Sequence, residues 1–313
     1  GVRGMAALLV DTAARAWQPA VRRAQPARAR ARRAAVASGT AVLQRVGHRY
    51  VAGPGIEDAL RAEDRVAGHG LAATLGFWDG PELAPAQVAA RYREAVDALS
   101  DGRERDTHVA VKLPALGMSA EILGEVAALA DAAGRRLHVD SLAPEDADRT
   151  QALVDGLREA HPGLAIGVTL PGRWRRSPAD AGWACERGLP VRVVKGEWAD
   201  PGDPERDMRE GFLAVIDRLA GGAAHVAVAT HDAALAREAV ARLRDAGTSC
   251  GLELLYGLPM RESLRQARAL DLGVRVYIPY GHAYTPYALG QLRRRPRTAF
   301  WIARDLAAGA VGA

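Results

Sequence analysis

The chain has 313 residues, of which 49% are hydrophobic and 25% are charged, so it can bury one large core or two small ones. No apolar run approaches about eighteen residues and charges interrupt the first apolar run, so neither a membrane span nor a secretory signal is predicted. The two cysteines, Cys185 and Cys250, exclude a disulfide framework and lack metal or redox spacing, and the expected location is the cytoplasm.

The net charge of +5 is concentrated at the N-terminus. Residues 1–50 contain ten arginines and one acidic residue, Asp11, a balance of +9 that leaves −4 for the rest of the chain. The arginine-rich run 22–33 has two interpretations: a solvated face of helices broken at Pro26, or a patch for nucleic acid or the inner membrane face. No aromatic residue interleaves these arginines, which favours the solvated face. We assign residues 1–67 to an N-terminal helical arm.

From residue 68 onward, short β-rich apolar runs alternate with segments of helical periodicity. The apolar runs cover residues 70–76, 108–113, 136–140, 165–170, 190–195, 224–230, 249–255 and 274–280. The helical segments begin near residues 84, 119, 144, 178, 203, 232, 259 and 285. Eight such units predict an α/β protein, a closed (β/α)8 barrel of TIM type over residues 68–313, with a closing helix at 298–308. An open doubly wound sheet would need a glycine-rich turn after its first strand, which is absent.

Aromatic and charged residues gather where the predicted strands end. Nine of the sixteen aromatic residues lie there: Phe77, Trp78, Trp174, Trp198, Tyr256, Tyr277, Tyr280, Tyr284 and Tyr287. Eight polar residues lie at the same level: Lys112, Asp140, Arg173, Arg192, Lys195, His231, Glu253 and His282. Flat apolar surface with a few convergent polar groups is typical of a site for an organic ligand at the catalytic end of a barrel. The alternative is that large residues simply plug that end.

Two cations, Arg192 and Lys195, end the fifth predicted strand. Strand alternation places them on opposite sides, although a break at Gly196 would let both reach the mouth and stabilise a developing anion such as a reduced flavin or a carboxylate. A Schiff-base lysine is a competing use of Lys195. Glu253 ends an apolar strand, so it either has a cation nearby or faces solvent. No complete set of metal ligands is present near His138 or elsewhere, so no metal is predicted.

Several strand ends together resemble the proline dehydrogenase family of FAD-dependent (β/α)8 barrels. The similar segments are RYVAG at 49–53, VKLPALG at 111–117, VD at 139–140, RVVKGEW at 192–198, ATHD at 229–232, LLYGL at 254–258 and RVYIPYG at 275–281. The order and spacing of these segments over residues 49–310 make the resemblance specific. It implies that Lys112, Asp140 and Tyr277 border the substrate and carry catalysis. It also implies FAD contacts from Arg192, Lys195, Gly196, Trp198, Thr230, His231, Leu255 and Tyr256.

The chain departs from the family pattern where the family binds the proline carboxylate. The family has paired arginines three and four residues beyond a tyrosine, whereas counting from Tyr287 gives Gly290 and Gln291. The family's first strand ends in a glutamate that pairs with one of these arginines, and Phe77 stands there instead. Losing both ends of one ion pair together suggests a remodelled site.

The remodelled substrate site is therefore expected to include Phe77, Tyr280, Tyr287, Gly290 and Gln291. It also includes Arg173, which stands in a segment where the family has a flavin-contacting glutamine and which offers a cation for a carboxylate bound in another way.

Our leading hypothesis is a flavoenzyme that moves a hydride from a C–N or N–N bond of an amine or amino-acid-like substrate to FAD, with a substrate other than free proline. Its electron acceptor is a quinone or oxygen. The alternatives are a true L-proline dehydrogenase with a displaced carboxylate clamp, a catalytically silent barrel whose basic arm binds nucleic acid or membrane, and a Schiff-base lyase using Lys195.

Overall fold

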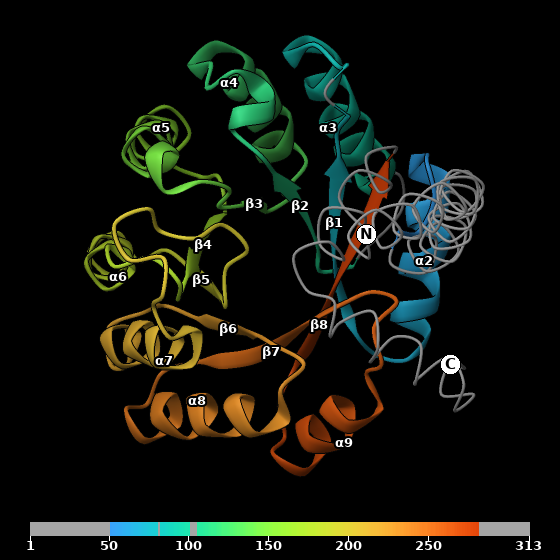
Figure 1. Cartoon of the computed structure of the whole chain (residues 1–313). Helices are drawn as coiled ribbons and strands as arrows, with labels where there is room; N and C mark the ends of the chain where they lie inside the picture. Colours follow the sequence, from blue (N-terminus) through green and yellow to red (C-terminus); the bar gives the residue numbers. More distant parts are fainter. Residues whose placement is uncertain (1–50, 81, 101–104, 282–313) are drawn as a thin grey trace, which may run out of the picture.

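The computed structural model of the chain describes residues 51–80, 82–100 and 105–281. Eight parallel strands form a closed barrel in which each strand pairs with the next and the last pairs with the first (Figure 1). The strands are β1 Ala72–Trp78, β2 Thr107–Val111, β3 Leu137–Val139, β4 Ile166–Pro171, β5 Val191–Val194, β6 Val226–Ala229, β7 Cys250–Leu255 and β8 Val274–Gly281. The predicted barrel is confirmed, and each predicted apolar run contains most of one strand.

Helices surround the barrel (Figure 1). They are α2 Ile56–Gly68, α3 Pro85–Ser100, α4 Ala120–Ala132, α5 Ala147–Ala160, α6 Ser177–Glu186, α7 Met208–Leu219, α8 Ala233–Asp245 and α9 Arg261–Ala269, with 3₁₀ turns η1 Pro114–Leu116 and η2 Pro144–Asp146. Side-chain caps fix several starts, because Ser119 accepts a hydrogen bond from Ile122 N and Asp232 accepts one from Leu235 N. The helices expected near 285 and at 298–308, like residues 1–50 of the predicted arm, lie outside the described residues.

Helix α7 begins five residues later than the predicted start at Asp203. The cap is Asp207, whose carboxylate accepts hydrogen bonds from the backbone nitrogens of Arg209 and Glu210 at 2.8 and 2.9 Å. Asp203 belongs to the preceding loop, which the buried Asp200 organises by accepting from Gly202 N at 2.8 Å. Both aspartates are suitable cap residues, so the sequence alone could not choose between them.

Strand β1 runs two residues past its predicted end, and this corrects the expected position of Phe77. Phe77 lies inside the strand, opposite Tyr280 of β8 in the register, and its side chain is buried. Its ring centroid is 5.4 Å from that of Tyr280 and 6.4 Å from that of Tyr92 of α3. Because side chains alternate along a strand, Phe77 and Tyr280 face the helices, whereas Trp78 faces the barrel interior.

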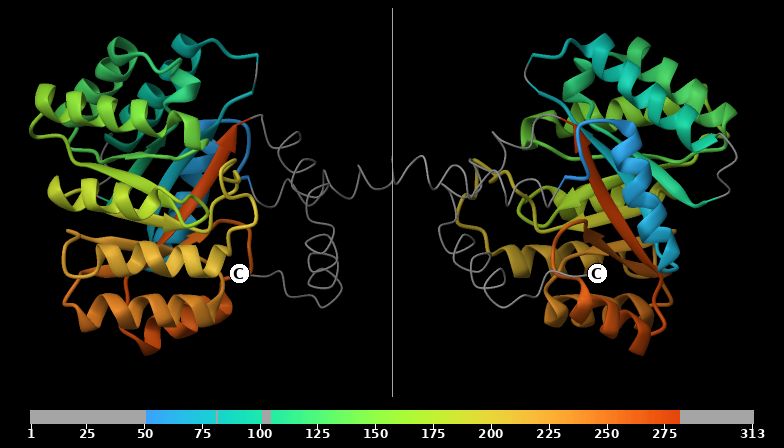
Figure 2. Two further views of the ribbon diagram at one scale, coloured as in Figure 1. Left: turned by 60° about the vertical axis from the view of Figure 1, so that its left-hand side comes forward. Right: turned by 90° about the vertical axis from the view of Figure 1, so that its right-hand side faces the viewer.

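Helix α2 packs against β8 and β1, beside the seam that closes the barrel (Figure 2). Its Glu63 is 1% exposed and accepts hydrogen bonds from Thr107 at 2.9 Å and from Arg105 at 2.7 Å. These contacts satisfy the buried carboxylate and tie α2 to the start of β2. Within the described ranges, no helix has the length and apolarity needed to span a membrane.

Candidate active site

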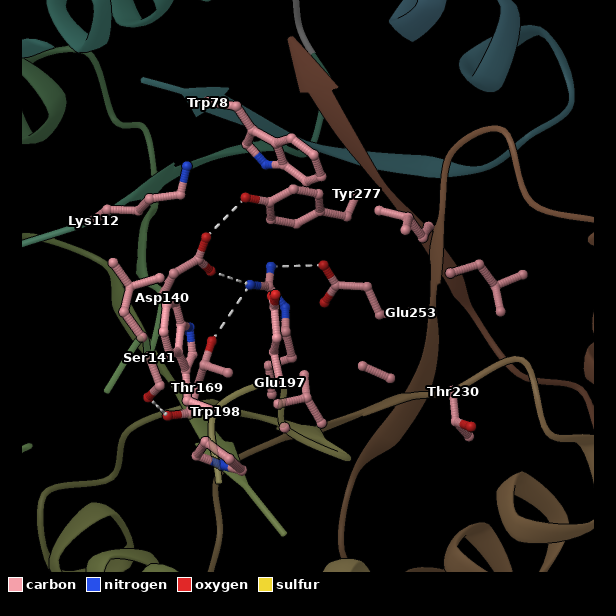
Figure 3. A pocket seen from close by; sticks show the side chains of 18 of the residues that line it. Trp78, Lys112, Asp140, Ser141, Thr169, Glu197, Trp198, Thr230, Glu253 and Tyr277 are labelled. Atoms are coloured by element: carbon pink, nitrogen blue, oxygen red, sulfur yellow. Dashed lines mark hydrogen bonds and ion pairs between the residues drawn. The ribbon is translucent and has the colours of Figure 1, made fainter. Parts of the chain in front are cut away.

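The candidate site is a cavity of about 580 Å³ at the carboxyl ends of the strands, called the C-terminal cavity below. Figure 3 shows that its side chains converge from β1, β2, β3, β4, β5, β6, β7 and β8. Of the residues predicted from the sequence, it is lined by Lys112, Asp140, Arg192, Gly196, Trp198, Thr230, His231, Leu255 and Tyr277. Its volume is in the range of sites that enclose organic ligands.

Arg192 lies at the centre of a buried charge network on the cavity floor. Its Nη1 is 2.7 Å from Oδ1 of Asp140, and its Nη2 is 2.6 Å from Oε1 of Glu253 (Figure 3). Only 4% of Arg192 is exposed. Burial alone would lower the pKa of Arg192, but the charges of Glu253 and Asp140 outweigh it and raise that pKa. The guanidinium is therefore a fixed positive charge, and the cation expected beside Glu253 is found.

The contact between Arg192 and Glu253 is close but poorly aligned for hydrogen bonding. Although the two atoms are 2.6 Å apart, Nη2 and Nε of Arg192 and Oε1 of Glu253 have no hydrogen-bond partner within the described part of the chain. We interpret the contact as an ion pair, because the distance is short and the angles are not those of a hydrogen bond. Asp140 and Glu253 therefore compensate the buried guanidinium mainly by charge.

Tyr277 completes the network from β8. Its hydroxyl donates to Oδ2 of Asp140 at 2.8 Å, and Cζ of Arg192 lies 5.1 Å from its ring centroid. Burial, reinforced by the negative charge of Asp140, raises the pKa of Tyr277 well above its usual value. The phenol therefore stays protonated and acts as a hydrogen-bond donor.

Gly76 makes room for the Tyr277 side chain, so Gly76→Ala is expected to displace it. A Cβ at this position would come 2.1 Å from the Tyr277 hydroxyl oxygen. The ring would have to move away from Asp140, and we expect kcat/KM to fall by about 10²-fold because misplacement of about 1 Å has effects of that size. Steady-state kinetics of Gly76→Ala test this expectation. The control is Gly124→Ala, where a Cβ would meet nothing within 4 Å. Equal kinetics in the two variants would contradict the packing role of Gly76.

Lys112 supplies a second cation at the cavity wall. Its Nζ donates to the carbonyl oxygen of Phe77 at 2.6 Å and lies 3.6 Å from Oδ1 of Asp79, under the ring of Trp78 at 5.8 Å. Burial lowers the pKa of Lys112, and the nearby charges of Asp140 and Asp79 oppose that shift. The ammonium thus has acidic partners that help to keep it charged.

His231 and Thr230 line the cavity, and their polar side-chain atoms already form hydrogen bonds within the protein. His231 accepts from Leu255 N at Nε2, 2.9 Å away, and its Nδ1 lies 3.2 Å from the carbonyl oxygen of Pro259. Burial lowers the pKa of His231, consistent with this neutral arrangement. Thr230 accepts from Asp232 N. Both residues shape the wall.

The described residues contain no group of three or more His, Cys, Asp or Glu side chains placed to hold a metal ion.

Other predicted site residues lie away from the C-terminal cavity. Lys195 is 40% exposed and its Nζ is 3.5 Å from Asp232, so alternation did place it opposite Arg192. The Arg173 guanidinium donates to the carbonyl oxygen of Glu197 at 2.8 Å and so secures the loop after β5. The remaining residues are Tyr256, whose hydroxyl accepts from Arg65 of α2 at 2.7 Å, and Phe77 and Tyr280, which face the helices. Tyr287, Gly290 and Gln291 lie outside the described residues.

The cavity is also lined by residues to which the sequence assigned no role in binding or catalysis. Trp78, Trp174 and Glu253 were expected at the strand ends, whereas Asp79, Ser141, Thr169 and Glu197 were not singled out. Thr169 lies on β4, and its Oγ1 accepts a hydrogen bond from Nη1 of Arg192 at 3.4 Å. Trp174 donates from Nε1 to the carbonyl oxygen of Trp198 at 3.0 Å. Strand alternation identifies Thr169 as an inward residue once Leu170 is assigned to the core. The resemblance to the family did not point to Thr169, because it concerned the segment that contains Arg173, after the end of β4.

Comparison with known proteins finds proline dehydrogenases. Proline dehydrogenase 1 of Bacillus subtilis subsp. natto is 25% identical over 274 residues, spanning 82% of this chain and 89% of the relative. Proline dehydrogenase of Deinococcus radiodurans is 22% identical over 284 residues, spanning 84% of this chain and 91% of the relative. These matches confirm the resemblance to proline dehydrogenases inferred from the strand-end segments. No protein-family model matches the chain.

Solved structures with the same barrel are found among proline utilization A proteins. The structure from Bdellovibrio bacteriovorus, inactivated by N-propargylglycine, has a TM-score of 0.69 at 17% identity and covers 80% of this chain. The structure from Corynebacterium freiburgense has a TM-score of 0.63 at 19% identity and covers 85% of this chain. The match spans only 33% and 32% of those longer chains, so these likenesses establish the fold of this chain and not the activities of the whole proteins.

Proposed function

We propose that this protein is an FAD-dependent oxidoreductase of the proline dehydrogenase type, with L-proline as the first candidate substrate. The observation that carries the proposal is Asp140, whose carboxylate joins Arg192 of β5 to Tyr277 of β8 on the floor of an aromatic-walled cavity. All three residues stand in the segments that resemble proline dehydrogenases. The relatives with those names, similar over most of their length, support the same reaction.

The residues of the C-terminal cavity fit a flavin. Trp78, Trp174 and Trp198 supply flat apolar surface, and the buried guanidinium of Arg192 has donor atoms without hydrogen-bond partners among the described residues. FAD, when bound there, supplies the acceptor for the hydride removed from the carbon next to nitrogen. Arg192 would stabilise negative charge on the cofactor without having to reorganise, because Asp140 and Glu253 hold it in place.

The remaining charges suit an amino-acid-like substrate. Among the described residues of the cavity wall, Lys112 is a cation that lies 3.6 Å from Asp79 and is not paired with Asp140 or Glu253, so it would attract the substrate carboxylate. Asp140 and Asp79 bring negative charge toward the substrate nitrogen, and Tyr277 stays protonated as a donor. No side chain has to act as general base if the amine binds unprotonated.

Two arguments for a substrate other than free proline are weaker than the sequence suggested. Phe77 faces the helices, so it does not line the cavity in place of the family's glutamate. Gly290 and Gln291 lie outside the described residues. The relatives are named proline dehydrogenases, and L-proline therefore becomes the first candidate. A different secondary amine remains the second candidate, because the chain has no arginine at 290 or 291.

Purified protein is expected to bind FAD and to oxidise L-proline with an artificial electron acceptor. Flavin absorbance tests the cofactor, and reduction of the acceptor at millimolar concentrations of L-proline tests the substrate. A protein that binds FAD but turns over only other secondary amines would favour the second candidate. A colourless protein that cannot be reconstituted with FAD would contradict both.

A further inference from the structure

A second cavity, the N-terminal cavity, lies at the opposite end of the barrel from the C-terminal cavity. It has a volume of about 530 Å³ and is lined from the starts of β1, β2, β3, β5, β6, β7 and β8. Its polar wall includes Asp106, His108, Arg136, His138, His225 and Arg275. The proposed flavin chemistry uses none of these side chains.

The positive charge of this wall is not fully compensated. Arg275 is already engaged, because it pairs with Asp106 and donates to the carbonyl oxygen of Ala73 at 2.6 Å. Glu253 borders the cavity but pairs with Arg192. Arg136 is only partly exposed, and its guanidinium makes no hydrogen bond or ion pair with any residue that the structure describes. One guanidinium thus remains available to a ligand.

Three histidines provide further donors around this guanidinium. His138 is 5% exposed, and its Nε2 lies 3.1 Å from Thr169 Oγ1. Its Nδ1 has no partner among the described residues. His108 donates from Nε2 to Asp106 at 3.0 Å, so its Nδ1 becomes a donor only in the imidazolium form that a bound anion favours. His225 uses Nδ1 toward Ser249 at 2.9 Å, which leaves its Nε2 for a ligand. Three strands, β2, β3 and the start of β6, therefore present donors to one space.

The electrostatic field of the cavity disfavours additional positive charge. Burial lowers the pKa of His138 well below its usual value, and the charges of Arg192, Arg275 and Arg136 contribute to the shift. Burial also lowers the pKa values of His108 and His225. A bound anion would reverse this penalty, because it favours the protonated imidazolium.

We propose that the N-terminal cavity binds a small phosphate-bearing anion, with Arg136 as its charged anchor and His108, His138 and His225 as hydrogen-bond donors. A carboxylate is planar and satisfied by one guanidinium, whereas a phosphate group has oxygens in three dimensions and accepts from donors on several strands. The cavity exceeds the size of a bare phosphate, so it also accommodates the organic part of a phosphate ester. This site is independent of the proposed flavin chemistry.

Calorimetric titration with inorganic phosphate and with glycerol phosphate tests the site. The protein is first loaded with FAD and separated from unbound cofactor, so that anion sites in the C-terminal cavity are filled and no free FAD competes through its own phosphates. We expect one phosphate group to bind per chain, and Arg136→Ala to weaken binding by about tenfold or more, as for loss of a charged hydrogen bond. Tighter binding of the ester identifies an organic phosphate as the ligand, and equal binding identifies free phosphate.

Two further measurements locate the bound anion. Arg237→Ala, which removes an exposed arginine of α8 without an ion pair to the described residues, should leave phosphate binding unchanged. NMR signals of the His108 and His225 imidazoles should shift on titration, and Arg136→Ala should keep its melting temperature in the absence of phosphate. Absence of binding of both probes, equal binding in Arg136→Ala and wild type, or binding without change in the histidine signals would overturn the proposal.

Discussion

Arg192→Met is expected to lower the free energy of unfolding by about 3–5 kcal/mol, the usual cost of leaving a buried charge without its partner. The substitution leaves two carboxylates facing each other in the barrel: Asp140 is 14% exposed in its side chain and Glu253 is 3% exposed. Methionine replaces part of the arginine volume, so the loss arises mainly from charge. Urea unfolding of the cofactor-free protein measures it without a contribution from flavin binding.

The matched control is Lys195→Met, three residues further along the chain. Lys195 pairs with Asp232 at 3.5 Å, but both side chains are 40% exposed, and such pairs contribute about 0–1 kcal/mol. The double variant Arg192→Met with Glu253→Gln should regain part of the stability because one uncompensated charge is removed. If Arg192→Met and Lys195→Met lose equal stability, Arg192, Asp140 and Glu253 do not form a buried ion cluster.

The barrel itself was predictable because its eight parallel strands are short apolar runs buried on both faces. The ends of those runs were less predictable. An error of one or two residues in a strand end changes which side chains are expected at the mouth of the barrel. Ending β1 at Gly76 instead of Trp78 made Phe77 a mouth residue, whereas the register places it opposite Tyr280 on the helix-facing side. The alternation between Arg192 and Lys195 was right because the end of β5 was placed within one residue.

The central network was predictable in part. A glutamate at the end of an apolar strand requires compensation, and Glu253 has it in Arg192. Its partner could not be chosen from the sequence, because 61 residues separate the two positions and β5 and β7 are brought together only by pairing with opposite edges of β6. The N-terminal cavity was missed for a different reason: His108, Arg136 and His225 lie at strand starts, where the general rule for barrels predicts stability and not binding.

Asp140→Asn is expected to reduce kcat/KM for the proposed amine oxidation by on the order of 10²-fold while FAD stays bound. Asparagine keeps an oxygen for the Tyr277 hydroxyl but loses the charge that fixes Arg192 and attracts the substrate nitrogen. Tyr277→Phe removes only the hydroxyl that donates to Asp140, so its effect should be smaller, about tenfold, as for loss of one hydrogen bond to a charged group.

The control for Asp140→Asn is Asp155→Asn on α5, where a carboxylate pairs with Arg187 at 2.5 Å outside the C-terminal cavity. The same chemical change there should alter kcat/KM by less than about twofold, because the residue contacts neither the proposed substrate nor the network. Flavin absorbance per chain separates the two possible causes of a loss in rate. If Asp140→Asn loses activity only in proportion to its FAD content, Asp140 serves cofactor retention through Arg192. If FAD content is normal and the rate falls, Asp140 acts on the substrate side of the cavity, which is its proposed role.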